Sequence, residues 1–322
     1  LGTSTMRSKD IAKAEECFRE AIALDPKHIP SLLAFGVLLC VRDKYPEAEN
    51  YFKAASAANG NDVLAWACCV VFFDLESRDV ERRSAMKQMF AAEKKGGISK
   101  KSPYLRAGSF CVELFAVQLV EHAMTQELMR NGDSEELRVM LGRTYLYNNQ
   151  HDKSREFLQD ALSRDKRCAV AMTLMGHNMY VEQGWEEYRC DRVLPSYKEA
   201  VAWYEKALAQ KQPNIDILQY YRLARMQIGG KKYSDAQDIL HKACKLQASA
   251  TTWLGLAICY YSQGQSSQSQ SSAKFMDMAE EALQEAAILD NTNPEVWGMT
   301  SVVCLAQAQL VKPGEIYAPK AD

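Results

Sequence analysis

A spacing of small and large side chains recurs along this chain and limits its possible folds more than any other feature. Ala14, Phe18 and Ala21 lie at steps of four and three residues. The same steps return 34 residues later at Ala48, Phe52 and Ala55, and then at five further places. These are Ala85, Met89, Ala92; Ser154, Leu158, Ala161; Ala200, Tyr204, Ala207; Ala236, Leu240, Ala243; and Ala279, Leu283, Ala286. One helix cannot repeat in this way, so the spacing predicts a helical repeat.

Each copy follows another helical pattern in which a bulky residue lies near a small one, as Leu32 does near Gly36. Small residues on both helices let two antiparallel helices approach closely, and stacked pairs cover each other's apolar faces. With Pro26 ending the first copy, the pattern resembles the tetratricopeptide repeat. That resemblance implies an all-α, right-handed superhelical solenoid of antiparallel helix pairs. A helical bundle without repeats would not explain the recurrence.

We expect residues 1–310 to form a single solenoid of about eight helix pairs, incomplete at both ends, and residues 311–322 to form a non-helical tail. The chain opens within a second helix and closes with a first helix from Trp297 to about Leu310, which suggests a fragment of a larger protein. Steps longer than 34 residues indicate insertions, the largest near 182–195 and 262–274. Because Ser and Gln dominate residues 262–274, we expect a flexible surface loop there. Residues 103–129 look like a degenerate pair, capped by Ser102 and ended by Asn131 and Gly132.

Composition excludes several classes of protein. Lys and Arg number 39 against 41 Asp and Glu, so the formal charge is −2, which argues against nucleic acid or an anionic membrane as a partner. The longest apolar runs have about ten residues, roughly half of what a membrane span needs. None of the ten cysteines forms a Cys-x-x-Cys pair, which indicates a reducing compartment. We expect the adjacent Cys68 and Cys69 to be buried packing thiols rather than a redox pair.

Motifs that would carry chemistry are absent from the sequence. The five histidines are isolated, and we find no P-loop, dinucleotide fingerprint or Gly-x-Ser-x-Gly elbow. We therefore predict no catalytic residue, no cofactor, no metal site and no small-molecule substrate. An enzyme would need a catalytic domain outside these residues.

The concave side of such a solenoid is lined by first helices and usually binds the partner. In register, Leu33, Val37 and Val71 give the early groove an apolar lining. Further along, the lining becomes basic and aromatic, which suits an extended or helical peptide. The candidate groove residues are Arg143, Tyr147, Thr173, His177, Tyr180, Tyr221 and Arg225. Two alternatives stay open: the tyrosines pack between repeats, and His177 is an ordinary helix histidine with its hydrogen bonds satisfied.

Three segments resemble one family more closely: "HIPSLLAFGVLLCVRDKYPEAENYFKAA", "TTWLGLAICYY" and "AEEALQEAAILDNTNPEVWGMTSVVCL". In order and spacing they are similar to the C-terminal repeat region of the cilia- and flagella-associated protein 70 family. The resemblance implies a non-enzymatic axonemal scaffold in the cytoplasm and cytoskeleton of motile cilia and flagella, needed for dynein-driven beating. It also implies partners at the outer dynein arm base or the central apparatus.

A soluble cytoplasmic adaptor or cochaperone that binds a peptide in the concave groove is the alternative. The groove does not match the Lys/Asn carboxylate clamp of chaperone-binding repeat proteins, which disfavours a chaperone tail as the ligand.

Overall fold

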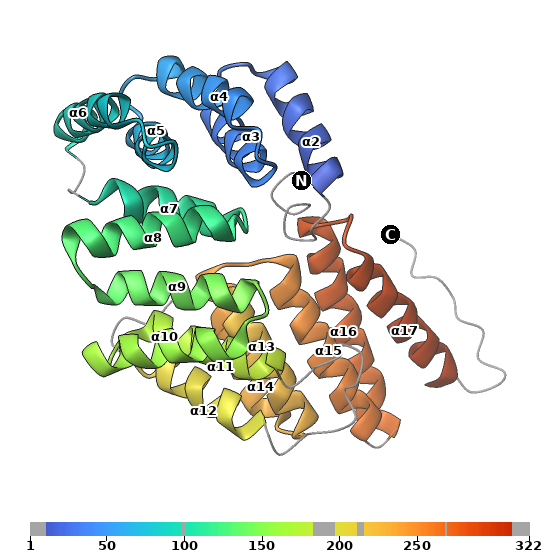
Figure 1. Cartoon of the computed structure of the whole chain (residues 1–322). Coiled ribbons are helices and arrows are strands. Elements are labelled where there is room, and N and C mark those ends of the chain that lie inside the picture. The colour runs from blue at the N-terminus through green and yellow to red at the C-terminus, as the bar shows by residue number, and fades with distance from the viewer. Residues whose placement is uncertain (1–10, 98–100, 183–196, 211–215, 268, 311–322) are drawn as a thin grey trace. The chain divides into compact units, whose positions relative to one another are not determined.

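The fold of the chain is given by a computed structural model, which describes residues 11–97, 101–182, 197–210, 216–267 and 269–310 (Figure 1). Every regular element within these ranges is an α-helix. The chain divides into two compact units, residues 1–174 and 175–322, and α11 (Ala169–Glu182) leads from the first into the second. The predicted all-α fold of antiparallel helix pairs is confirmed.

The described residues of the first unit contain α2, four helix pairs that follow one another along the chain, and the start of α11 (Figure 1). Helix α2 packs on α3, the two helices of each pair pack on each other, and α5 also packs on α7. The helices are α2 (Ile11–Leu24), α3 (Ile29–Val41), α4 (Tyr45–Ala58), α5 (Val63–Leu75), α6 (Asp79–Gly96), α7 (Pro103–Glu113), α8 (Val117–Asn131), α9 (Glu135–Tyr147) and α10 (His151–Arg164).

The second unit has the same construction. Helices α13 and α14 pair with each other, as do α15 and α16, while α17 packs on both helices of the α15–α16 pair. The helices are α12 (Tyr197–Leu208), α13 (Ile217–Gly229), α14 (Tyr233–Leu246), α15 (Ala250–Ser266), α16 (Ser269–Leu289) and α17 (Pro294–Leu310).

The recurring small–large spacing marks the buried face of the second helices. In all seven copies the first small residue and the large residue are at most 6% exposed. First-helix glycines meet these large side chains: a Cβ added at Gly36 would lie 2.9 Å from Phe52, and one added at Gly176 would lie 2.5 Å from Tyr204. Helices therefore approach at these points to distances that only glycine allows.

An eighth copy of the spacing lies in the degenerate region. Helices α7 and α8 form a pair, and Val120, Met124 and Glu127 of α8 occupy the small, large and small positions at no more than 4% exposure. Glu127 is buried because its carboxylate accepts hydrogen bonds from Asn131 and from Ser102, the residue that caps α7. Valine and glutamate in place of alanine hid this copy from the sequence pattern. The predicted helix start at Ser102 and stop at Asn131 and Gly132 are confirmed.

Five turns within helix pairs share one backbone geometry. Each contains a non-glycine residue with a positive φ between 56° and 59°, namely Asp43, Ser77, Phe115, Asn149 and Lys231. The turns at Asp43 and Ser77 are 34 residues apart, so the longer step from Ala48 to Ala85 reflects no insertion between these turns. Instead, the first small residue of the buried face lies farther from the turn in α6 than in α4: Ala85 follows Ser77 by eight residues, whereas Ala48 follows Asp43 by five.

Residues 262–266 and 269–274 of the Ser/Gln-rich segment are helical, so the prediction of a flexible loop across these residues is wrong. Helix α15 continues to Ser266 and α16 starts at Ser269. The Ser266 and Ser267 hydroxyls donate to backbone carbonyls one turn earlier, and Gly264 packs against Met276. Gly264 therefore allows close helix packing here, which composition alone did not indicate. Of the other predicted insertion, near 182–195, all but Glu182 lies outside the described residues, as do the Gln212–Pro213 break and the tail (311–322).

Candidate functional site

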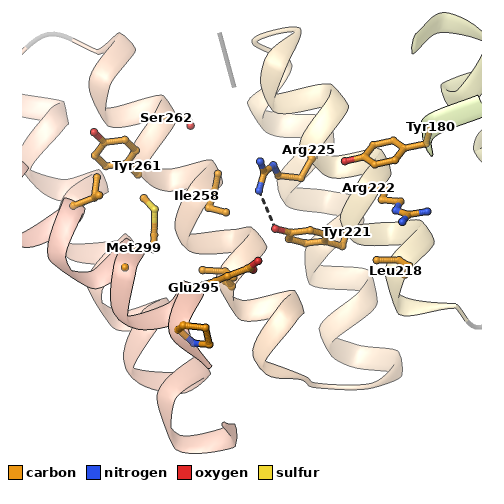
Figure 2. A pocket seen from close by; sticks show the side chains of 14 residues that line it. Tyr180, Leu218, Tyr221, Arg222, Arg225, Ile258, Tyr261, Ser262, Glu295 and Met299 are labelled. Atoms are coloured by element: carbon orange, nitrogen blue, oxygen red, sulfur yellow. Dashed lines mark hydrogen bonds between the residues drawn. The ribbon is translucent and has the colours of Figure 1, made fainter. Parts of the chain in front are cut away.

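A groove in the second unit brings together the inner faces of four first helices (Figure 2). Its volume is about 620 Å³. The lining residues are Tyr180 of α11; Leu218, Tyr221, Arg222 and Arg225 of α13; Leu254, Ile258, Tyr261 and Ser262 of α15; and Pro294, Glu295, Gly298, Met299 and Val302 of α17. On α13, α15 and α17 the lining residues lie three or four positions apart, so each helix presents one face.

The α11–α13 side of the groove is aromatic and basic. Arg225 donates a hydrogen bond of 2.9 Å from Nη1 to the hydroxyl of Tyr221, as Figure 2 shows. The guanidinium of Arg222 lies 4.7 Å from the ring centroid of Tyr180, within range of a cation–π interaction. These contacts fix both arginines in place at the wall of the groove.

His177 lies beneath this wall and is 6% exposed. Its Nδ1 lies 3.0 Å from Nη1 of Arg222, which can only donate, and 2.7 Å from the hydroxyl of Tyr204. Nδ1 therefore accepts, and Nε2 donates to Asp216 at 3.0 Å. This network ties α11, α12 and α13 together.

The network also sets the protonation of its members. Burial raises the pKa of Tyr204 well above its usual range, so its hydroxyl stays protonated. Burial also pushes the pKa of Asp216 upward, but hydrogen bonds from His177 and from the backbone N–H groups of Leu218 and Gln219 outweigh it. The pKa of Asp216 is therefore lowered, and its carboxylate stays ionised to cap α13.

Three of the seven predicted groove residues line this groove: Tyr180, Tyr221 and Arg225. His177 does not line it, but its Nδ1 lies 3.0 Å from Nη1 of Arg222, which does. Arg143 belongs to the first unit, where it pairs with Glu113 at 3.0 Å and lines a separate cavity of about 520 Å³ beside Ser109 and Cys168.

Tyr147 and Thr173 line neither cavity. The ring of Tyr147 stacks on Phe115 with centroids 4.9 Å apart, and Thr173 is fully buried with its hydroxyl donating to the carbonyl of Ala169. Tyr147 therefore packs between repeats, which was the alternative to a groove role that the sequence left open.

The early groove is closed. Leu33, Val37 and Val71 are at most 3% exposed and belong to the core, so they offer no apolar binding surface. Cys68 and Cys69 are likewise buried, which confirms their role as packing thiols.

Several lining residues escaped the sequence analysis, above all Arg222, Tyr261, Glu295 and Met299. A signal for Arg222 was present, because it lies four residues after Leu218 and three before Arg225 on one helical face. No such signal marked α17, since its groove face depends on how it packs against α15 and α16.

Among the described residues, no helix combines the length and the apolar character that a membrane span needs, and no three His, Cys, Asp or Glu side chains are grouped as metal ligands.

Comparison with solved structures gives distant likenesses. A human IFIT1 dimer with m7Gppp-AAAA matches 94% of this chain and 69% of its own, at 12% identity and a TM-score of 0.49. The Cut9–Hcn1 hetero-tetramer of the APC/C matches 94% of this chain and 48% of its own, at 15% identity and a TM-score of 0.33.

Family comparisons are more informative. Residues 1–92 match the middle TPR-like domain of cilia and flagella-associated protein 70, residues 190–311 match the C-terminal domain of the same protein, and residues 135–168 match the tetratricopeptide repeat. The curated relative from Macaca fascicularis, Cilia- and flagella-associated protein 70, is 25% identical over 98% of this chain. The human protein of that name is 32% identical over 26% of it.

The chain spans 30% of the length of the macaque relative, and the matched stretch is 8% of the human one. Two domains of one protein thus match in order along the helix pairs described above. The chain belongs to the cilia- and flagella-associated protein 70 family of tetratricopeptide-repeat proteins.

Proposed function

We propose that this chain is a non-enzymatic scaffold of the motile ciliary and flagellar axoneme, which holds other axonemal proteins in place for the assembly or regulation of dynein-driven motility. The observation that carries the proposal is the match of both ends of the chain to one cilia- and flagella-associated protein. Stacked helix pairs supply long solvent-facing surfaces for such a role.

The groove of the second unit is the surface we propose for partner binding. It combines three tyrosines and two arginines, and such residues dominate the binding energy of many interfaces. Its partner is a protein at the outer dynein arm base or in the central apparatus.

The scaffold proposal is tested by localisation and rescue. Tagged full-length protein in motile ciliated cells is expected along the axoneme, and its removal is expected to reduce beat frequency. Proximity labelling from the tag then separates the two partner sites, because dynein-arm and central-apparatus proteins are distinct sets. A tag confined to the cell body, with normal beating after removal, would overturn the proposal in favour of a soluble adaptor or cochaperone.

A variant of the groove, assayed by the same proximity labelling, tests whether the groove binds the partners. Arg225→Glu reverses a charge at the wall and removes the donor to Tyr221, so we expect the labelled partners to be lost while the protein remains folded. Arg83→Glu, at an exposed position on α6, is the matched control and is expected to keep them.

A further inference from the structure

The two sides of the groove in the second unit differ in chemistry (Figure 2). Arginine and tyrosine side chains form the α11–α13 side. The opposite side is mostly apolar, formed by Leu254 and Ile258 of α15 with Met299 and Val302 of α17. An occupant that fills this space must therefore be amphipathic.

The apolar side excludes an extended peptide as the best occupant. An extended chain needs hydrogen-bond partners for its backbone N–H and C=O groups when it is buried. The α15 and α17 side offers few such partners, chiefly the side chains of Tyr261, Ser262 and Glu295. A helix satisfies its own backbone and can lay an apolar stripe against ridges of side chains spaced three and four residues apart.

Arg222 supplies a fixed positive charge on one wall. Its guanidinium is held by the Tyr180 ring and by His177, whose imidazole is fixed in turn by Tyr204 and Asp216. No carboxylate of the described residues forms an ion pair with Arg222. A guanidinium whose position is set in advance loses little entropy when it binds a carboxylate.

The opposite wall supplies a negative charge and open space. Glu295 is exposed in the first turn of α17 and has no cationic partner among the described residues. One turn further along, nothing lies within 4 Å of the place where a Cβ of Gly298 would sit. That space lets a backbone approach the groove wall closely.

We propose that this groove binds an amphipathic α-helix of a partner protein, with the apolar stripe of that helix on α15 and α17. An acidic side chain of the helix pairs with Arg222, and a basic side chain on its other flank pairs with Glu295. The two charges fix the direction in which the helix lies. This inference rests on the proposed scaffold function, since it names the kind of partner segment that the scaffold holds.

Selection of displayed random 16-residue peptides on the full chain tests the proposal. Enriched peptides are expected to carry apolar residues at i, i+3 or i+4, and i+7, with an acidic flank and a basic flank. Synthetic copies are expected to become helical on binding, by circular dichroism, and to bind at least tenfold more weakly when a central residue is replaced by proline. Enrichment of proline-rich or non-helical peptides, or no enrichment, would overturn the proposal.

Variants of the chain locate the site. Gly298→Leu adds a bulky side chain to the groove at a position where a Cβ meets nothing within 4 Å, so we expect at least tenfold weaker binding with no loss of melting temperature. Gly60→Leu is the matched control, because Gly60 also has open space around it but lies in the first unit, and it is expected to bind normally. Peptides that bind Gly298→Leu as well as the native chain do not use the groove, which contradicts the proposal.

Charge reversal tests the orientation. Arg222→Glu is expected to weaken binding of the acidic peptide about tenfold and to strengthen binding of a copy whose acidic residue is lysine. This rescue excludes simple unfolding as the cause of the first effect. If the Arg222→Glu variant binds the acidic peptide and its lysine copy equally well, lysine gives no rescue, and the assigned contact with Arg222 is wrong. Failure in these assays leaves axonemal localisation unaffected, so it is distinguishable from failure of the scaffold function.

Discussion

Glycines of the first helices are the residues at which packing is tightest. At Gly176 an added Cβ would lie 2.5 Å from Cε1 and 2.6 Å from Cδ1 of Tyr204. The tyrosine is fully buried and its hydroxyl is bonded to His177, so the ring cannot move aside without disturbing that network. Gly298 lies in α17 with no neighbour within 4 Å. The two glycines therefore differ in packing alone.

Substitution by alanine separates the two cases. Alanine in a helix interior gains about 1 kcal/mol over glycine, whereas overpacking a core costs about 1–3 kcal/mol. Gly176→Ala is expected to lower the free energy of unfolding, and Gly298→Ala is expected to leave it equal or raise it. Urea denaturation followed by circular dichroism measures both midpoints. A similar midpoint shift for the two variants would contradict this account of the close approach.

At the scale of the helix pair, the turn rather than the helix is the constant element. In the α13–α14 turn, the N–H of Lys231 donates to the carbonyl of Ile228 and the N–H of Lys232 donates to that of Gln227. Lys231 lies at φ 59°, where a side chain costs roughly 1–2 kcal/mol that glycine would not. Hydrogen bonds of the same pattern close the other four turns with a positive φ.

The same substitution is therefore expected to have opposite effects at two positions. Lys231→Gly removes the strain of the left-handed turn and is expected to raise the free energy of unfolding by about 1 kcal/mol. Lys242→Gly, at an exposed position inside α14, is expected to lower it by about the same amount. Thermal unfolding of both variants checks the signs. Destabilisation by Lys231→Gly would mean that its side chain contributes more than its backbone costs.

Helix existence and type were predictable from the sequence because small residues, mostly alanine, recur at the buried positions where paired helices approach each other closely. The predicted copies are buried as expected, and α17 runs from Pro294 to Leu310. The helical Ser/Gln residues were not predictable from composition, since the hydroxyls of Ser266 and Ser267 donate to backbone carbonyls of α15. The α8 copy was missed because Glu127 is buried only with the help of Ser102 and Asn131.

At the scale of the whole molecule, thiols serve as core side chains. Burial raises the pKa of Cys69 and of Cys111 from about 9 to about 12. Both thiols stay protonated in the folded chain at pH values where an unfolded chain would ionise them. Stability from this source is complete below about pH 9 and is lost as the pH rises toward 12.

The free energy of unfolding is therefore expected to fall above about pH 9, by about 1.4 kcal/mol per pH unit for each such thiol. Urea denaturation at intervals between pH 8 and pH 11 measures the slope. Cys69→Ala is expected to reduce the slope by the contribution of one thiol, about 1.4 kcal/mol per pH unit. Cys304→Ala, at an exposed position, is expected to leave the slope unchanged. A slope that is flat, or equal in all three proteins, would contradict the burial of these thiols.

The sequence by itself determined the helix pairs, their antiparallel contact and the family. The pairs and their contact follow from the recurring spacing of small and large residues, because a helix fixes which of its residues share a face. The family followed from the resemblance of three segments. Only the tertiary structure decided which predicted groove residues meet. Tyr180, Tyr221 and Arg225 line one groove, while His177 lies beneath it and Arg143 lines a separate cavity. The physical reason is that a groove is formed by residues from several helices, and their exposure depends on how closely the neighbouring helices pack.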